Sequence, residues 1–420
     1  MRIALLCVGS RGDVQPMVAL GVALRRRGHD VVLAVPSDLV GFARRAGLDA
    51  VSAGVDAREF LQSAEGQRWL AAGDSRRYLT ALARRRAEVI GDVQDALIGA
   101  ARGADVIVAS RLVEDDAAVL AEHAGVPLVC LHYAPSRPNR VVPPYFLTVR
   151  RLPAPVTALA HEVAARVHWR AIASSVNALR ARLGLRPVRT PTAPRLARAG
   201  TVEIQAYSAA LVPRIAGWEA YRPMVGFLGL DAGTRERLGE RGVSPDLDRW
   251  LDDGDPPVYL GFGSMPAADP DRMLAMVRGL PARVLVGAGW DVRPSRDLFV
   301  TGALDHDAVL PRCRAAVHHG GAGTTAAALR AGLPALVCAV FGDQPFWGTR
   351  LRALGAGDWM RFADLDARRL HDGVARLLAP EPRAAAARLA TRLAAEGGAA
   401  DRAAELVEAR LTAGYGGRTG

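Results

Sequence analysis

A glycine-rich turn between an apolar strand and a helix constrains the fold of this chain more than any other feature. Residues 315–317 form an apolar run typical of a strand end, and Thr324 begins an apolar-periodic helix that stops near Gly332. Three glycines lie between them: Gly320, Gly321 and Gly323. Glycine lets a ligand approach the main chain closely, and a helix N-terminus offers unpaired N–H groups. The pattern predicts a phosphate-binding turn, with a plain strand-to-helix connection as the alternative.

A second strand follows directly and favours the phosphate site. Residues 335–340 are apolar and lead into Asp343 and Gln344. Ligands of open parallel sheets bind beyond the carboxyl ends of the strands, so this pair is expected at the same edge as the glycine turn. A carboxylate beside an amide offers the acceptors and donors that sugar hydroxyls need. Phosphate and sugar sites at one edge predict a nucleotide-sugar ligand.

Composition restricts the class of protein. The 420 residues exceed the roughly 250–300 at which single cores stop growing, so we expect two domains. All 54 basic residues are arginine and the net charge is +11, but they are scattered, so coding bias explains them better than a nucleic-acid groove. Weak attraction to anionic membrane surfaces remains open. No run approaches about 18 apolar residues, and the four cysteines lack metal-ligand spacing. We therefore expect a cytoplasmic protein without a transmembrane segment.

Alternating strands and helices occur in both halves of the chain. We expect a first Rossmann-like domain over residues 1–228, a linker rich in Gly, Asp and Pro over 229–257, and a second such domain over 258–400. A C-terminal helix and tail, 401–420, is a candidate to pack back on the first domain. Residues 135–195 are irregular and rich in proline, with long amphipathic helices expected near residues 161–183, and are interpreted as an insertion that shapes a variable pocket. Near the N-terminus, the first strand leads into a helix with Pro16 expected in its first turn.

Three segments carry a resemblance to a known family: residues 9–16, 259–265 and 318–347. The chain resembles the inverting glycosyltransferases of the GT-B fold, which use nucleotide-diphosphate sugars. It is most similar to the bacterial branch with sterol glucosyltransferases and glycopeptide-antibiotic glycosyltransferases, and the match is weakest over about 135–225. The resemblance implies an α/β fold in which two Rossmann-like domains face each other across a cleft.

The same resemblance implies a donor site, whose residues by position are Ser10, Arg11, Ser264, Trp290, His319, Gly321, Gly323, Thr324, Asp343 and Gln344. His319, if protonated, and Arg11 would stabilise the departing diphosphate without a metal ion. Trp290 is equally compatible with a base pocket and with a buried core. His132 is the candidate for acceptor binding, with a packed core histidine as the favoured alternative.

Asp13 is the expected catalytic base. Many relatives have a histidine in this loop, whereas the chain has aspartate, as in the glycopeptide and sterol branch. An ordinary aspartate has a pKa of about 3.9 and is a weak base. That is sufficient when attack at the anomeric carbon is advanced before the acceptor proton leaves. The alternative role is an N-cap before Val14, worth about 1 kcal/mol, and the two roles are compatible.

Two departures from the family pattern bear on the ligands. Ala327 stands where plant relatives have a ribose-binding glutamate, so uridine and thymidine donors remain open. The pair Asp253 and Asp255 resembles the metal motif of the other glycosyltransferase fold, but it lies among Pro and Gly and is interpreted as a solvated turn. We expect neither a metal nor a cofactor, the nucleotide-sugar being a co-substrate.

The expected function is metal-independent, inverting transfer of a sugar from a UDP- or TDP-sugar to a hydroxyl of a small apolar acceptor. A natural-product aglycone of antibiotic biosynthesis or other secondary metabolism, a sterol and a lipid all fit. A nicotinamide oxidoreductase is disfavoured, because no G-x-G-x-x-G follows the first strand. Two alternatives remain: a nucleotide-sugar epimerase of the same fold, and a non-catalytic activator of another glycosyltransferase. The sugar, the acceptor and the oligomeric state stay open.

Overall fold

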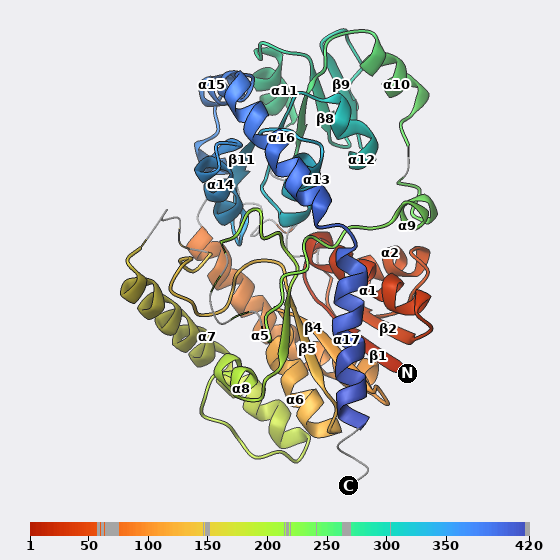
Figure 1. Cartoon of the computed structure of the whole chain (residues 1–420), viewed down its shortest axis with the longest axis vertical. Coiled ribbons are helices and arrows are strands. Elements are labelled where there is room, and N and C mark those ends of the chain that lie inside the picture. The colour runs from red at the N-terminus through yellow and green to blue at the C-terminus, as the bar shows by residue number, and fades with distance from the viewer. Residues whose placement is uncertain are drawn as a thin grey trace.

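The chain forms two α/β domains, each built on a six-stranded parallel sheet, as the computed structural model shows (Figure 1). The structure describes residues 1–56, 59, 63, 75–145, 147, 152–213, 215, 218, 220–240, 242–262, 270–302 and 304–415. The strand orders are β3-β2-β1-β4-β5-β6 and β12-β11-β10-β7-β8-β9. Both are the doubly wound Rossmann order, so the expected α/β fold class is confirmed.

The first sheet takes its strands from the N-terminal half of the chain. They are β1 (Arg2–Leu6), β2 (Asp30–Val35), β3 (Asp49–Ser52), β4 (Val106–Ser110), β5 (Leu128–His132) and β6 (Val202–Gln205). The helices of this half are α1 (Arg11–Arg26), α2 (Val40–Arg45), α5 (Ser75–Ala101), α6 (Glu114–Ala124), α7 (Ala154–Arg182) and α8 (Thr192–Arg198), with a 3₁₀ turn η1 (Ser37–Leu39). The central strands are apolar throughout because helices cover both faces of a parallel sheet.

The second sheet takes its strands from the C-terminal half. They are β7 (Val258–Gly261), β8 (Val284–Gly287), β9 (Leu298–Thr301), β10 (Ala315–His318), β11 (Ala335–Ala339) and β12 (Gly357–Arg361). The helices that follow β6 are α9 (Ala232–Arg237), α10 (Pro245–Asp252), α11 (Pro270–Arg278), α12 (His306–Val309), α13 (Ala322–Arg330), α14 (Gln344–Ala353), α15 (Ala367–Leu377), α16 (Pro380–Ala395) and α17 (Ala399–Tyr415), with 3₁₀ turns η2 (Leu310–Arg312) and η3 (Phe362–Asp364).

The segments that join the two domains are more structured than the composition indicated. Residues 229–257 contain α9 and α10, and Trp250 of α10 packs in the core of the second domain. At the other end, α17 leaves the second domain and runs along α1 (Figure 1). Its residues Ala403 and Val407 belong to the core cluster of the first sheet.

Three strands, β3, β6 and β12, were not predicted. In β6 the reason is chemical: its sequence Val-Glu-Ile-Gln carries two polar side chains that are nevertheless buried. Glu203 accepts from Arg137 at 2.8 Å and from Arg222 at 2.5 Å, so tertiary partners compensate its charge. In the proline-rich region, the long helix expected near residues 161–183 is present as α7, which has 29 residues and begins earlier, at Ala154. None of the described helices is both long and apolar enough to cross a membrane.

Candidate functional site

The turn after β1 holds the proposed base by a helix cap. Ser10 is the N-cap of α1, and its Oγ accepts from the Gly12 amide at 3.2 Å. Asp13 lies at the third helical position, where its Oδ2 accepts from the Ser10 amide at 2.8 Å. This capping box corrects two expectations: Asp13 is not the N-cap, and Pro16 lies in the helix interior rather than in its first turn. The helix begins earlier because Ser10 satisfies its first free amide.

The surroundings of Asp13 make it a stronger base than an ordinary aspartate. Burial raises its pKa to about 6, and the charge of Asp343 adds to the rise while the hydrogen bonds from Ser10 oppose it. Gly9 has φ of +115°, and a Cβ there would lie 2.4 Å from Asp13 Oδ2. The close approach of backbone and carboxylate therefore requires glycine.

The glycine turn between β10 and α13 has the form that an anion site needs. The Gly320 amide donates to His318 Nδ1 at 2.9 Å, which anchors the turn to the strand. The helix begins at Ala322, two residues before the expected Thr324, with Gly321 as its N-cap. No side chain of the described residues caps it. The first-turn amides thus precede the helical hydrogen-bond ladder and face outward along the helix axis.

His319 is neutral, so the condition of protonation that was attached to its charge-stabilising role is not met. Burial, with a smaller contribution from His306, lowers the pKa of His319 to about 4. Its Nδ1 is buried and has no hydrogen-bond partner among the described residues. A neutral imidazole still has one N–H to donate, so His319 can bind a phosphate oxygen as a dipole without contributing charge.

Asp343 and Gln344 lie directly before and at the start of α14, one strand away from the glycine turn. Asp343 Oδ2 accepts from the Trp347 indole at 2.7 Å, and burial raises the pKa of Asp343 to about 6. Gln344 Oε1 accepts from the Val340 amide at 2.7 Å. The pair therefore offers a ligand mainly a carboxylate acceptor from Asp343 and an amide donor from Gln344, a narrower set than the sequence indicated.

The three remaining candidates for the donor site, Arg11, Trp290 and Ser264, differ in their surroundings. Arg11 pairs with Glu240 at 2.5 Å, and its guanidinium lies over the Phe42 ring. After burial, the positive charge of Arg11 is the largest cause that lowers the pKa of His306 in the second domain. Trp290 is partly buried against the second-domain core. Ser264 lies outside the described residues.

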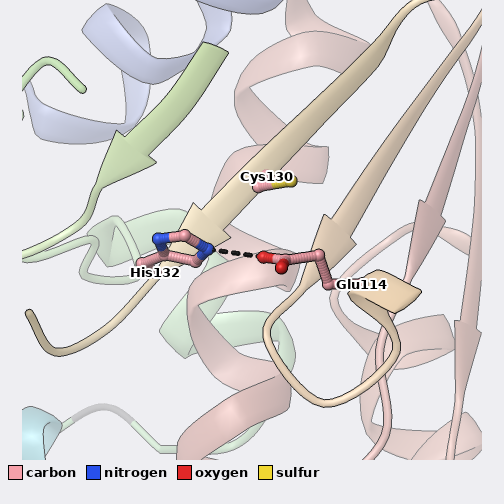
Figure 2. Close-up of side chains that lie close together, drawn as sticks. All are labelled: Glu114, Cys130 and His132. Carbon is pink, nitrogen blue, oxygen red and sulfur yellow. Dashed lines mark hydrogen bonds and ion pairs between the residues drawn. The ribbon is translucent and has the colours of Figure 1, made fainter. Parts of the chain in front are cut away.

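His132 is buried, and the structure places it in a charge network (Figure 2). Its Nε2 lies 2.7 Å from Glu114 Oε2, and its Nδ1 lies 3.4 Å from the Gln205 amide nitrogen. With no exposed surface it cannot contact an acceptor in this conformation, so the packed-histidine alternative describes it better. Glu114, Cys130 and His132 lie close enough together to hold a metal ion. The Arg137 guanidinium, 2.8 Å from Glu114, already supplies the positive charge there.

The sequence reasoning missed Tyr145, which senses the charges of Asp13 and Asp343, and Arg111, whose charge acts on Tyr145. The pKa of Tyr145 is raised by burial and further by the charges of Asp343 and Asp13, with Arg111 opposing. Arg111 follows β4, the neighbour of β1, and its guanidinium is 3.6 Å from Asp115. Tyr145 lies in the segment of weakest resemblance, and Arg111 resembles many scattered arginines, so neither gave a sequence signal.

Both halves of the chain match known family patterns. Residues 3–143 match the glycosyltransferase family 28 N-terminal domain, and residues 298–409 match the erythromycin biosynthesis protein CIII-like C-terminal domain. An uncharacterized glycosyltransferase of Mycobacterium leprae (strain TN) is 35% identical, covering 97% of this chain and 96% of its own length. The O-mycaminosyltylonolide 6-deoxyallosyltransferase of Streptomyces fradiae is 34% identical, covering 84% of each chain.

Solved structures agree on the fold. The crystal structure of glycosyltransferase VinC in complex with dTDP superposes with a TM-score of 0.67 at 21% identity, covering 98% of this chain and 99% of that one. That likeness and the two facing Rossmann sheets establish the GT-B architecture, and the identity with the glycosyltransferases above extends over nearly the whole chain. The chain therefore belongs to the family 1 type of GT-B glycosyltransferases, and the protein is a glycosyltransferase.

Proposed function

We propose that the protein transfers a sugar from a UDP- or TDP-sugar to a hydroxyl of a small apolar acceptor, with inversion and without a metal ion. The observation that carries the proposal is the relation between Asp13 after β1 and Asp343 before α14. They belong to different domains, and yet the charge of one raises the pKa of the other. A sugar held by Asp343 would thus present its anomeric carbon to the domain that carries the base.

Asp13 acts as the general base in this proposal. A carboxylate with a pKa of about 6 is mostly ionised at neutral pH and accepts a proton more readily than an ordinary aspartate. Both bonds from Ser10 end on Oδ2, so Oδ1 is the atom assigned to the acceptor hydroxyl. The proton moves to Oδ1 as the acceptor oxygen bonds to the anomeric carbon and the bond to the diphosphate breaks.

The donor diphosphate is assigned to the N-terminus of α13. Amides of Gly323 and Thr324, the N–H of neutral His319 and the helix dipole can all stabilise the negative charge that develops on the leaving group. Arg11 would add a full positive charge after exchanging its partner Glu240 for phosphate. The bound dTDP in the VinC structure supports a thymidine donor, while uridine remains the second option.

The acceptor is assigned to the first domain, near Tyr145 and Arg111. The Streptomyces relative is named for glycosyl transfer to a tylonolide, and this supports a natural-product acceptor and a role in antibiotic biosynthesis. We place the reaction in the cytoplasm, where nucleotide-sugars are substrates.

A direct assay tests the proposal. Purified protein is incubated with UDP-glucose or TDP-glucose and a panel of macrolide, sterol and lipid acceptors, with and without EDTA, and products are analysed by mass spectrometry and by NMR of the anomeric proton. We expect one donor to give an inverted glycoside at a rate insensitive to EDTA. Retention of configuration, or activity lost to EDTA and restored by Mg²⁺, would refute the mechanism. Conversion of the nucleotide-sugar without an acceptor would establish the epimerase instead.

A thermal-shift screen with UDP, TDP, GDP and NAD tests the donor separately from the acceptor. A ligand at a hundredfold excess over its Kd stabilises the native state by about 2.7 kcal/mol. We expect UDP or TDP to raise the melting temperature. A response to NAD alone would overturn the assignment.

A further inference from the structure

Trp347 ties the Asp343 carboxylate to its own helix. The indole Nε1 donates to Asp343 Oδ2 at 2.7 Å, and the two residues are four apart, one turn of α14. Trp347 is 0% exposed, so water does not compete with Asp343 for the indole N–H. A bond between a buried rigid donor and a carboxylate restricts the rotation of that carboxylate.

The same indole ring also packs against two aromatic residues from the segment that follows β6. Its ring centroid lies 6.2 Å from that of Tyr207 and 5.6 Å from that of Phe227. The Tyr207 hydroxyl donates to Gln205 Oε1 at 2.7 Å, and Gln205 is the last residue of β6. The segment of Phe227 is attached to β6 as well, because the Val225 amide donates to the Gln205 carbonyl at 3.0 Å.

A second contact holds α14 in the same place. Arg350, three residues beyond Trp347, donates through Nε to the Leu211 carbonyl at 2.6 Å. The helix that begins beside Asp343 is therefore fixed to the segment after β6 at two points on one face. A displacement of that segment would move the indole and, with it, the carboxylate.

We propose that Trp347 is a positioning residue, which orients Asp343 toward the donor sugar and makes that orientation depend on its packing against Tyr207 and Phe227. Donor-sugar binding and the relative placement of the two domains are then coupled through one side chain. This inference rests on the proposed assignment of Asp343 to the sugar. It adds a role for Trp347 and a coupling between the domains that the resemblance does not assign.

Trp347→Phe is the central variant, because it keeps an aromatic ring and removes the N–H. We expect the KM for the nucleotide-sugar to rise about 10-fold or more, since a hydrogen bond to a charged group is lost. The Kd for the free nucleoside diphosphate, which lacks the sugar, should change less than about twofold. The Trp347 bond lowers the pKa of Asp343, so its loss should move the acidic limb of kcat/KM for the donor to higher pH.

Trp250→Phe is the matched control. Trp250 is also a nearly buried tryptophan of the second domain, and its indole donates to the Ser295 carbonyl at 2.7 Å, away from Asp343. Both variants lose one indole hydrogen bond of 2.7 Å in the second domain, so the control shows what the loss of an indole bond by itself does to the fold. Only Trp347→Phe should change the donor KM and the acidic limb.

Phe227→Leu tests the coupling to the first domain. It removes a ring contact to Trp347 and should raise the donor KM while leaving nucleoside diphosphate binding intact. A donor KM unchanged in Trp347→Phe overturns the positioning role of Trp347, and a donor KM unchanged in Phe227→Leu overturns its coupling to the first domain. If Trp347→Phe does not fold, Phe227→Leu decides alone by the same criterion.

Asp343→Asn separates this inference from the proposed function. If it leaves donor KM unchanged, Asp343 does not bind the sugar, and both the assignment and the inference are wrong. If Asp343→Asn impairs donor use while Trp347→Phe behaves like Trp250→Phe, the assignment of Asp343 stands and only the positioning role of Trp347 is lost.

Discussion

Asp13 Oδ2 accepts hydrogen bonds from both the backbone amide and the hydroxyl of Ser10, at 2.8 and 3.1 Å. The same serine caps α1, so one local motif starts the helix and sets the orientation of the proposed base. Because both bonds end on Oδ2, the second oxygen can face the acceptor. The capping box of Ser10 and Asp13 therefore also holds the proposed catalytic carboxylate.

The first prediction separates these two roles. The Asp13→Asn variant keeps an oxygen that can accept from Ser10 but cannot take a proton at neutral pH, so turnover should fall about 10²–10⁴-fold. The Asp13→Ala variant should lose similar activity and should be about 1 kcal/mol less stable than Asp13→Asn, because both lack the buried charge and only the alanine loses the capping box. Turnover and urea unfolding measure the two effects. Normal turnover in Asp13→Asn would remove Asp13 from the mechanism.

The second prediction concerns pH. Because burial raises the pKa of Asp13 to about 6, the rate should fall below about pH 6 rather than near pH 4. The Asp343 charge contributes to this rise, so Asp343→Asn should move the acidic limb to lower pH. The measurement is kcat/KM for the acceptor at saturating donor. A limb that stays in place in Asp343→Asn would show that the two carboxylates do not interact.

The third prediction concerns stability, and its sign follows from linkage. The folded pKa of Asp13, about 6, exceeds the unfolded value near 3.8, so the native state binds the proton more tightly. Native stability from this group is greatest below about pH 4 and declines as pH rises to about 6. Asp13→Asn removes the buried charge and should raise the melting temperature by a few degrees at pH 8, on the order expected for about 1 kcal/mol.

That gain should disappear near pH 4, where the carboxyl of the unmodified protein is itself protonated. Calorimetry at both pH values makes the comparison, with Asp30→Asn, an exposed carboxylate at the start of β2, as the control. Equal gains at pH 4 and pH 8 would contradict the electrostatic explanation.

The fourth prediction uses two glycines of one turn. Gly320 has φ of +91°, and a Cβ there would lie 2.4 Å from Val337, so Gly320→Ala should lower the melting temperature markedly. At Gly323 an added Cβ meets nothing within 4 Å. Gly323→Ala should therefore fold normally, yet weaken nucleoside diphosphate binding where its methyl group meets the phosphate. Unchanged TDP and UDP affinity in Gly323→Ala would place the diphosphate elsewhere.

The main strands were accessible from the sequence because central parallel strands are buried on both faces, whereas their order in each sheet came from the structure. Continuous apolar runs such as those of β1, β4, β10 and β11 keep this signal whatever their neighbours are. The position of Asp343 beside the glycine turn follows from the same rule, since adjacent parallel strands end at one edge. Strand β6 was not predicted, because the charge of its buried Glu203 is compensated by Arg137 and Arg222, which lie elsewhere in the sequence.

The amino-acid sequence by itself determined two Rossmann-like domains and a glycine turn at a helix start, because local apolar period and turn chemistry encode them. Its motifs at residues 9–16, 259–265 and 318–347 carried the resemblance to the glycosyltransferase family. Only the tertiary structure decided that His319 is neutral, that Asp13 has a raised pKa and that Trp347 links Asp343 to the segment after β6. The neutral state of His319 depends mainly on burial, and the properties of Asp13 and Trp347 depend also on neighbours more than a hundred residues away in the chain. The protonation and orientation of a side chain depend on its burial and on the groups packed against it, and both arise only when the chain folds.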